Sequence, residues 1–221
     1  FAISTSPDPD INPILNAADR MIEAGHYEQA IEDLNTKAYP WISKPGSVTP
    51  EQERRYHLAK AKAIYRGQQK LKLDHDENHV AVIREYLEFE RLGGSLAPRD
   101  LTSLANTYLA RGEIDLALQR ARAIPMTERV LADEIRKRVV DNLLNRPNPE
   151  EERAMGLLAD MLTDAQLSPE DTVWALERQG KIRLAKGYAD ETITRLLRTM
   201  PRLERAGVAG RSRLHLILAR A

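Results

Sequence analysis

The chain has 221 residues, of which 42% are hydrophobic, 30% are charged and 5% are aromatic. This composition is typical of a folded chain with an aliphatic core and argues against an intrinsically disordered one. The 33 Lys and Arg residues balance the 33 Asp and Glu residues, so the basic excess of a dedicated nucleic-acid binder is missing. The chain contains no cysteine, which excludes disulfide bonds and cysteine-ligated zinc sites.

The hydropathy of the chain and its first residues bear on where in the cell the protein is expected. No apolar run approaches the roughly 18 residues that span a bilayer, and the first residues show no secretory signal pattern. We expect a soluble protein without a membrane span; the sequence leaves the compartment open and favours the cytoplasm over the periplasm. Residues 1–10 are rich in Pro, Ser, Thr and Asp, which favours turns and extended structure. They are predicted to form a flexible tail before one helical domain over residues 11–221.

Prolines mark the expected helix starts in chain order. Proline suits the first helical turn, where its missing N–H leaves no hydrogen bond unmade, and a preceding Ser, Thr or Asn is a good N-cap. Between these starts, apolar residues recur every three or four positions and show no convincing period of two, which predicts an all-α fold of about ten or eleven helices. The expected starts are Asn12-Pro13, Thr49-Pro50, Ala97-Pro98, Asn148-Pro149 and Ser168-Pro169.

Residues 101–125 carry the most informative pattern, in which large, small and turn-forming residues alternate at fixed spacing. The residues concerned are Leu101, Leu104, Ala105, Tyr108, Gly112, Ala117 and Ala121. This pattern resembles the tetratricopeptide repeat (TPR), a pair of antiparallel helices. We expect Ala105 and Ala117 to let the two helices cross closely, and Gly112 to let the chain turn between them.

The resemblance recurs along the chain with varying quality. Residues 14–34 match well, whereas residues 176–197 have Arg183 where an aromatic residue is expected and Thr192 where alanine is expected. The expected units are residues 14–34, 56–92, 101–125, 128–163 and 176–197. The resemblance implies an α-α superhelix, a TPR-like solenoid of about five helix pairs plus a terminal helix. An ordinary helical bundle is the alternative.

The last segment, residues 211–221, is predicted to form that terminal helix. Terminal repeats normally carry a polar capping face, but this segment is apolar on several sides. Either the helix caps the stack or the natural chain continues beyond it. We therefore expect only partial covering of its apolar side chains, which are Leu214, Leu216, Ile217 and Leu218.

One segment, residues 74–79, is dense enough in metal-ligating side chains to consider as a site. His75 and His79 are four residues apart and would share a helix face, with Asp74 or Asp76 completing a metal shell. The simpler interpretation is a polar turn in which Asp76 caps the following helix. No metalloprotease helix, phosphate-binding glycine loop or nucleophile elbow occurs. We expect no catalytic residue, no metal and no cofactor, and predict that the protein is not an enzyme.

Charge is distributed in blocks. Residues 1–53 hold nine acids and three bases, and residues 54–73 hold seven bases and no acid. Residues 192–221 hold seven arginines and one acid. Solvated surface is the simpler explanation, and an acidic partner steered by these basic surfaces is the functional hypothesis. The basic side chains considered for partner binding are Lys62, Arg66 and Lys70 on one expected helix face, and Arg198, Arg202 and Arg205 near the C-terminus.

The resemblance implies a protein-interaction scaffold, because helical-repeat arrays hold a peptide or partner protein on a long concave surface. It further implies that the first helix of each pair lines that surface. In the two best units the residues concerned are Leu15, Asp19, Ile22, Thr102, Asn106 and Leu109. Each is equally well explained as ordinary solvent-facing surface.

Two further possibilities remain open at this point. The chain would also suit a regulatory or sensor module of a larger protein, with an enzymatic or DNA-binding domain outside these residues. Self-association of the acidic start with the basic end of another copy is a second possibility, and such a head-to-tail contact can extend into open assemblies. Nucleic acid is not expected, because aromatic residues that stack on bases are not interleaved with the arginines.

Overall fold

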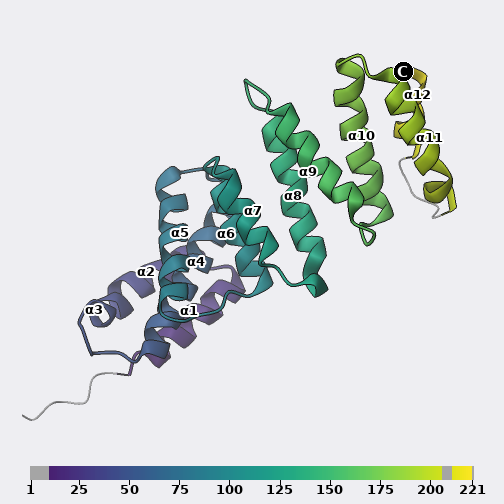
Figure 1. Cartoon of the computed structure of the whole chain (residues 1–221). Helices are drawn as coiled ribbons and strands as arrows, with labels where there is room; N and C mark the ends of the chain where they lie inside the picture. The colour runs from purple at the N-terminus through teal and green to yellow at the C-terminus, as the bar shows by residue number, and fades with distance from the viewer. Residues whose placement is uncertain (1–9, 206–210, 221) are drawn as a thin grey trace, which may run out of the picture. The chain divides into compact units, whose positions relative to one another are not determined.

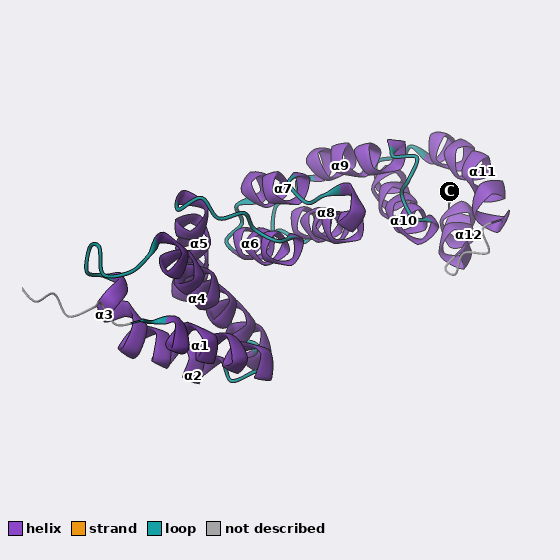
Figure 2. Cartoon of the chain, turned by 90° about the horizontal axis from the view of Figure 1, so that it is seen from below, coloured by secondary structure: helices purple, strands orange, loops and turns teal. Residues whose placement is uncertain are grey.

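A computed structural model describes residues 10–205 and 211–220 of the chain. These residues form α-helices joined by turns and contain no β-strand (Figure 1; Figure 2). The predicted all-α fold is therefore confirmed. Within the described residues, no helix has the length and apolar character needed to cross a membrane. Residues 1–9 of the predicted tail lie outside the described residues.

The chain divides into two compact units, residues 1–135 and 136–221. The first contains α1 Asn12–Ala24, α2 Tyr27–Asp33, a π-helical turn Leu34–Ala38, α3 Tyr39–Ile42, α4 Pro50–Leu71, α5 Asp76–Arg91, α6 Pro98–Ala110, α7 Ile114–Arg122, a 3₁₀ turn Met126–Glu128 and the start of α8 Arg129–Leu144. The second contains the rest of α8, α9 Glu151–Thr163, α10 Pro169–Ala185, α11 Ala189–Arg205 and α12 Arg211–Arg220. The single repeat domain expected over residues 11–221 stays a prediction.

Three of the five expected helix starts are confirmed. Thr49 caps α4 with a full capping box, in which its hydroxyl accepts the backbone N–H of Gln52 and the Gln52 side chain accepts the N–H of Thr49. Ser168 caps α10 by accepting the backbone N–H of Asp171 at 3.0 Å. The third start is Pro98, the first residue of α6. Side-chain acceptors thus satisfy donors that a helix start leaves unpaired.

The other two expected N-caps are wrong. Asn12 is already the first helical residue of α1, and its backbone N–H is accepted by the Asp10 carboxylate at 2.9 Å. Asn148 stands two residues before Glu150, which is the N-cap of α9, and that helix begins at Glu151. Pro13 is the second helical residue of α1, whereas Pro149 lies outside α9, so a proline alone does not fix the first helical residue.

The helix pairs α1–α2, α6–α7 and α10–α11 share one turn geometry. Gly25, Gly112 and Gly187 follow the first helix of each pair with φ of 80°, 74° and 84°, in the left-handed region that favours glycine. In each turn the residue after the glycine donates its backbone N–H to the carbonyl five residues earlier, at 2.8–2.9 Å. The same hydrogen bond thus ends the first helix of each of the three pairs. The predicted role of Gly112 as the turn residue is confirmed.

Small buried residues stand at matching places around these three glycines, seven positions before each and five positions after it. They are Ala18, Ala30, Ala105, Ala117, Gly180 and Thr192. A Cβ on Gly180 would lie 3.6 Å from Cγ2 of Thr192 and 3.2 Å from Cγ2 of Ile217. Gly180 is therefore a point where α10 approaches both α11 and α12 closely. Ala105 and Ala117 are fully buried where α6 packs on α7, as the sequence predicted.

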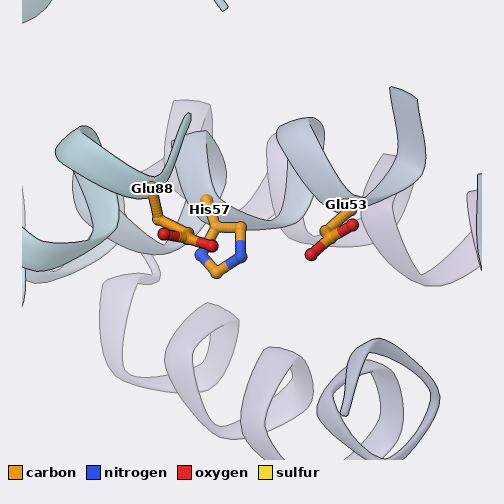
Figure 3. Close-up of side chains that lie close together, drawn as sticks. All are labelled: Glu53, His57 and Glu88. Atoms are coloured by element: carbon orange, nitrogen blue, oxygen red, sulfur yellow. The ribbon is translucent and has the colours of Figure 1, made fainter. Parts of the chain in front are cut away.

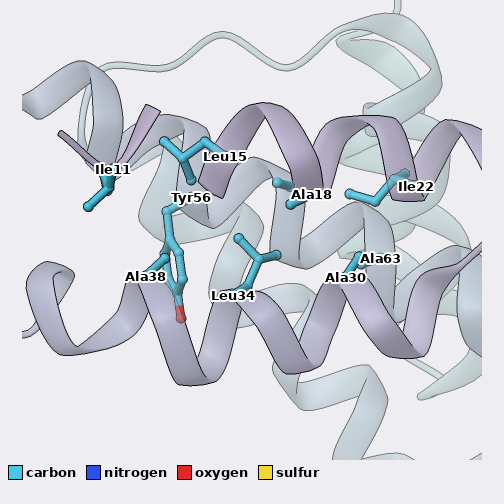
Figure 4. Close-up of a cluster of buried hydrophobic side chains, with 10 residues drawn as sticks. Ile11, Leu15, Ala18, Ile22, Ala30, Leu34, Ala38, Tyr56 and Ala63 are labelled. Carbon is cyan, nitrogen blue, oxygen red and sulfur yellow. The ribbon is translucent and has the colours of Figure 1, made fainter. Parts of the chain in front are cut away.

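One apolar core cluster of the first unit lies where α1, α2 and α4 pack together (Figure 4). Its buried members are Ile11, Leu15, Ala18, Ile22, Ala30, Leu34, Ala38, Tyr56, Ala59 and Ala63. Small residues let α4 approach its neighbours: a Cβ on Gly67 would come within 3.2 Å of the Tyr27 Cβ. Helix α2 thus packs on α4 as well as on α1.

The second unit has its own apolar cluster, formed by α10, α11 and α12. Its buried members are Val173, Leu176, Leu196, Met200, Leu203, Leu214 and Ile217. The expected partial covering of the terminal helix is confirmed for Leu218, which is partly buried, but is wrong for Leu214 and Ile217, which are buried against α10 and α11. Leu216, which lies on the other side of α12, is exposed.

Candidate functional site

Three of the six residues expected on an inner binding surface are core residues instead. The exposed fractions of Leu15, Ile22 and Leu109 are 1%, 3% and 9%, so almost no side-chain area remains for a partner. Leu15 and Ile22 belong to the apolar core of the first unit (Figure 4). Helix α1 directs Leu15 and Ile22 toward α2 and α4. The predicted exposure of Leu15, Ile22 and Leu109 is therefore wrong.

The other three residues are at least partly exposed, and each has a neighbour of its own. The Asp19 carboxylate accepts a hydrogen bond from Arg55 at 2.9 Å. Asn106 donates to the hydroxyl of Tyr65 at 3.3 Å, while Thr102 bonds a backbone carbonyl within α6. These contacts do not join the three side chains into one site. Their role in partner binding stays a prediction.

The expected basic face of α4 is present but is engaged inside the unit. Lys62 lies 3.4 Å from the Asp100 carboxylate on α6, and Arg66 lies 3.1 Å from the Glu23 carboxylate on α1. Lys70 donates to the backbone carbonyl of Gly25 at 2.9 Å. These cations therefore tie α4 to neighbouring elements and offer little uncompensated charge to a partner.

A basic hollow of about 590 Å³ lies on α10 and α11 of the second unit. Arg198, one of the residues expected to bind a partner, lines it and is exposed. We call this site the arginine hollow; its lining residues are Arg183, Asp190, Glu191, Thr194, Arg195, Arg198 and Thr199. The side chains of Arg202 and Arg205, also expected to bind a partner, lie outside what the structure describes.

The arginines of this hollow are incompletely paired. Arg183 donates through one terminal nitrogen to Glu191 at 3.0 Å, but its Nε is buried and has no hydrogen-bond partner. The side chains of Arg195 and Arg198 form no hydrogen bond or ion pair with the described residues. Burial, and then the positive charge of Arg183, lower the pKa of Arg195. Cations crowded in this way favour an anion between them.

A smaller hollow of about 350 Å³ shares Arg183 and Glu191 with the arginine hollow. Part of its lining is apolar or aromatic, and the side chain of Tyr188 in it is half exposed. The second unit therefore places a surface lined by arginines next to a surface that is partly apolar. The further lining residues are Glu152, Met155, Ile182 and Lys186.

A second polar cluster, in the first unit, surrounds a hollow of about 400 Å³ between α4 and α5. His57 Nδ1 lies 2.6 Å from the carboxylate of Glu85, whose side chain is only 4% exposed. The same carboxylate accepts from Arg84 at 2.8 Å and lies 3.7 Å from the ammonium of Lys60. Lys60 also donates to the hydroxyl of Tyr56 at 2.9 Å.

The electrostatics of this cluster keep Glu85 charged. Burial acts to raise the pKa of Glu85, but the hydrogen bonds from His57 and Arg84 and the nearby positive charge of Lys60 together outweigh burial and hold the pKa below its ordinary value. Burial, followed by the charge of Glu85, raises the pKa of the Tyr56 hydroxyl. At neutral pH the cluster thus holds an ionised carboxylate and a protonated phenol.

Residues 74–79 do not assemble the metal site that their sequence allowed. His79 is buried, with Nδ1 3.2 Å from Gln68 and Nε2 2.7 Å from Asp74, so both ring nitrogens are engaged. Asp76 pairs with Arg111, the residue that follows the end of α6. The expected cap is also shifted by one residue, because Asp76 begins α5 and His75 precedes it as N-cap.

Sequence reasoning singled out Arg198 but missed Arg183 and Arg195, the other cations of the arginine hollow. Arg183 gave one signal, because it occupies the place where the repeat pattern expects an aromatic residue. His57, Glu85 and their neighbours gave no signal, since they come from two separate stretches of sequence. No family model matches the chain, and searches among curated proteins and among solved structures also gave no match.

Proposed function

We propose that the protein is a non-catalytic interaction module that binds an acidic segment of a partner protein in the arginine hollow. The observation that carries this proposal is the state of the three arginines. Arg195 and Arg198 have no side-chain partner among the described residues, and the buried Nε of Arg183 has no hydrogen-bond acceptor. A carboxylate between them would accept charge-assisted hydrogen bonds and relieve the repulsion between cations.

The neighbouring hollow indicates what kind of acidic segment would fit. Because it shares Arg183 and Glu191 with the arginine hollow and adds the exposed ring of Tyr188, a peptide would place an acidic side chain among the arginines and an apolar side chain nearby. The balanced charge of the chain favours such a peptide over nucleic acid, which needs a broad basic surface. Asp190 and Glu191 in the lining would also repel a continuous phosphate backbone.

The repeated helix pairs supply the frame for this proposal. Three pairs share the same glycine turn and the same spacing of small buried residues, which supports a TPR-like array in which each pair is one unit. In such an array, recognition comes from side chains that the units hold in place, and no bond of the partner is broken. The proposed function therefore includes no chemistry.

Fluorescence polarisation of labelled peptides tests the proposal with the full chain. One peptide carries alternating Glu and Leu residues, and its matched control carries Gln in place of every Glu. We expect the acidic peptide to bind, the Gln peptide to bind at least about tenfold more weakly, and salt to weaken the acidic peptide's binding because screening acts over roughly 10 Å at 0.1 M.

A charge-matched pair of variants locates the binding. Arg195→Glu with Arg198→Glu should weaken the acidic peptide's binding by about tenfold or more. Arg99→Glu with Arg122→Glu changes the net charge equally at exposed positions of the first unit and should preserve binding. Equal losses in the two double variants would mean that net charge, and not the arginine hollow, attracts the peptide, and the proposal would then fail.

A further inference from the structure

We propose that the first unit binds a divalent metal ion of the zinc class through Glu53, His57 and Glu88. Each residue offers one ligand atom, and these atoms all lie within 4.8 Å of one another (Figure 3). Bonds of about 2.0–2.2 Å to a shared ion require ligand atoms about 3–4 Å apart. The two glutamates are partly exposed, so small rotations of their side chains bring the oxygens to that separation. This site is independent of the arginine hollow and of its proposed function.

Two packed helices bring the three ligands together. Glu53 and His57 are four residues apart on α4 and share a helix face, and Glu88 comes from α5, which packs along α4. Because α4 and α5 belong to the same compact unit, folding holds the ligands near one another before any ion arrives. A bound ion would connect the two helices.

A buried carboxylate orients the histidine. Glu85 accepts a hydrogen bond at 2.6 Å from Nδ1 of His57 when the neutral ring carries its proton there, and this leaves the lone pair on Nε2 for a metal. Histidines that bind metals usually donate their other N–H to such an acceptor, which fixes the ring and its tautomer. Glu85 would therefore be a positioning residue for this site and not a ligand.

The ligand set indicates the class of metal. One imidazole nitrogen with two carboxylate oxygens suits zinc and its first-row neighbours, whereas calcium and magnesium prefer oxygen ligands alone. Three protein ligands leave a tetrahedral ion one position for water. The adjacent hollow, which His57 and Glu88 line, provides space for that water.

Neighbouring cations set a limit on the affinity. Glu88 is held by the exposed side chain of Arg91, whose Nε lies 2.9 Å from both carboxylate oxygens. A metal has to displace that contact, whereas the Glu53 carboxylate makes no hydrogen bond with the described residues. Lys60 and Arg84 lie nearby but contact Glu85. We therefore expect moderate affinity that rises when Arg91 is removed.

Calorimetric titration of the metal-free full chain with zinc chloride, in excess magnesium, tests the site. We expect one zinc ion per chain. Glu53→Gln and His57→Gln should each weaken binding by at least about tenfold, and Glu53→Gln should change thermal unfolding only slightly, because its carboxylate makes no hydrogen bond and acts only through its charge on Arg91 and on the first turn of α4. Arg91→Ala should strengthen binding by about 1.4- to 5-fold, the equivalent of one surface ion pair.

His75→Ala provides the control, because His75 lies in the other histidine-rich segment and should not affect binding. The visible spectrum of bound cobalt gives a second readout, and its ligand-field bands should shift in His57→Gln. The proposal is overturned if the chain binds no zinc at 100-fold excess over protein, if Glu53→Gln and His57→Gln bind like the parent, or if His75→Ala alone abolishes binding.

Discussion

The basic residues of α4 and those of α10–α11 look alike in the sequence but have different neighbours. Every Lys and Arg of α4 has an electrostatic or hydrogen-bond partner within the first unit; they are Arg54, Arg55, Lys60, Lys62, Arg66 and Lys70. In the arginine hollow, Arg195 and Arg198 have no such partner among the described residues. Local charge density therefore does not identify a recognition surface until internal partners have been assigned.

The acidic N-terminal block explains the difference. Asp19 and Glu23 of α1 pair with Arg55 and Arg66 of α4, so two blocks of opposite charge partly neutralise each other inside one unit. In the arginine hollow the acidic lining residues are Asp190 and Glu191, and neither pairs with Arg195 or Arg198 among the described residues. Self-association of the acidic start with the basic end of another copy would have to compete with the pairs that α1 already makes.

The largest expected effect tests whether a close helix crossing stabilises the second unit more than its surface charges do. Gly180→Leu should lower the free energy of unfolding by about 1–3 kcal/mol, because a Cβ there already comes within 3.2 Å of Ile217. Gly156→Leu in α9 is the matched control, since nothing lies within 4 Å of a Cβ at that position. Chemical denaturation measures both. Similar denaturation midpoints for the two variants would contradict the placement of Gly180 at a close helix crossing.

The next effect separates the two basic regions directly. Arg198→Glu should weaken binding of the acidic peptide by about tenfold, or about 1.4 kcal/mol, and leave the melting temperature unchanged. Arg66→Glu should lower the melting temperature and leave binding of the peptide unchanged, because Arg66 pairs with Glu23 of the same unit. Polarisation and thermal melting on the same samples test the contrast. If Arg66→Glu weakened binding as much as Arg198→Glu, the distinction between the regions would be lost.

A smaller effect measures the internal pairing of α4. A double-mutant cycle with Glu23→Gln and Arg66→Gln should give a coupling energy of about 0.2–1 kcal/mol, since the Glu23 side chain is exposed, the Arg66 side chain is partly exposed and water screens the pair. The coupling should decrease at high salt. A coupling of zero would make this contact ordinary surface, and α4 would then resemble the arginine hollow more than we infer.

The smallest expected effect concerns acid and the second unit. Burial acts to raise the pKa of Glu177, but the hydrogen bond from Lys181 and the charges of Lys181 and Arg213 outweigh it and lower the pKa from 4.5. A lowered folded-state pKa contributes stability above the unfolded-state value, and that stability is lost as the pH falls through the folded-state pKa. Unfolding curves below pH 4.5 should therefore depend less on pH in Glu177→Gln than in the parent. Identical pH dependence would contradict this assignment.

The helical fold was predictable because its signals are local. The capping pair Thr49-Pro50 and the glycine at position 112 act within one helix or one turn, and the small residues at 105 and 117 act within one pair of consecutive helices, so spacing along the chain decides the geometry. The inner-surface residues were less predictable. The pattern that placed Leu15 and Ile22 on one side of α1 could not show that α4 covers this side.

Both candidate sites need contacts between separate helices, which spacing along the chain does not encode. The sequence by itself determined the helices, the glycine turns and the blocks of charge, because each follows from neighbouring residues. Only the tertiary structure decided which cations are neutralised, which arginines share a hollow and that Glu88 lies beside His57. The physical reason is that charge pairing and ligand geometry act through space: the Arg66–Glu23 pair joins residues 43 positions apart, and folding alone sets the distance between them.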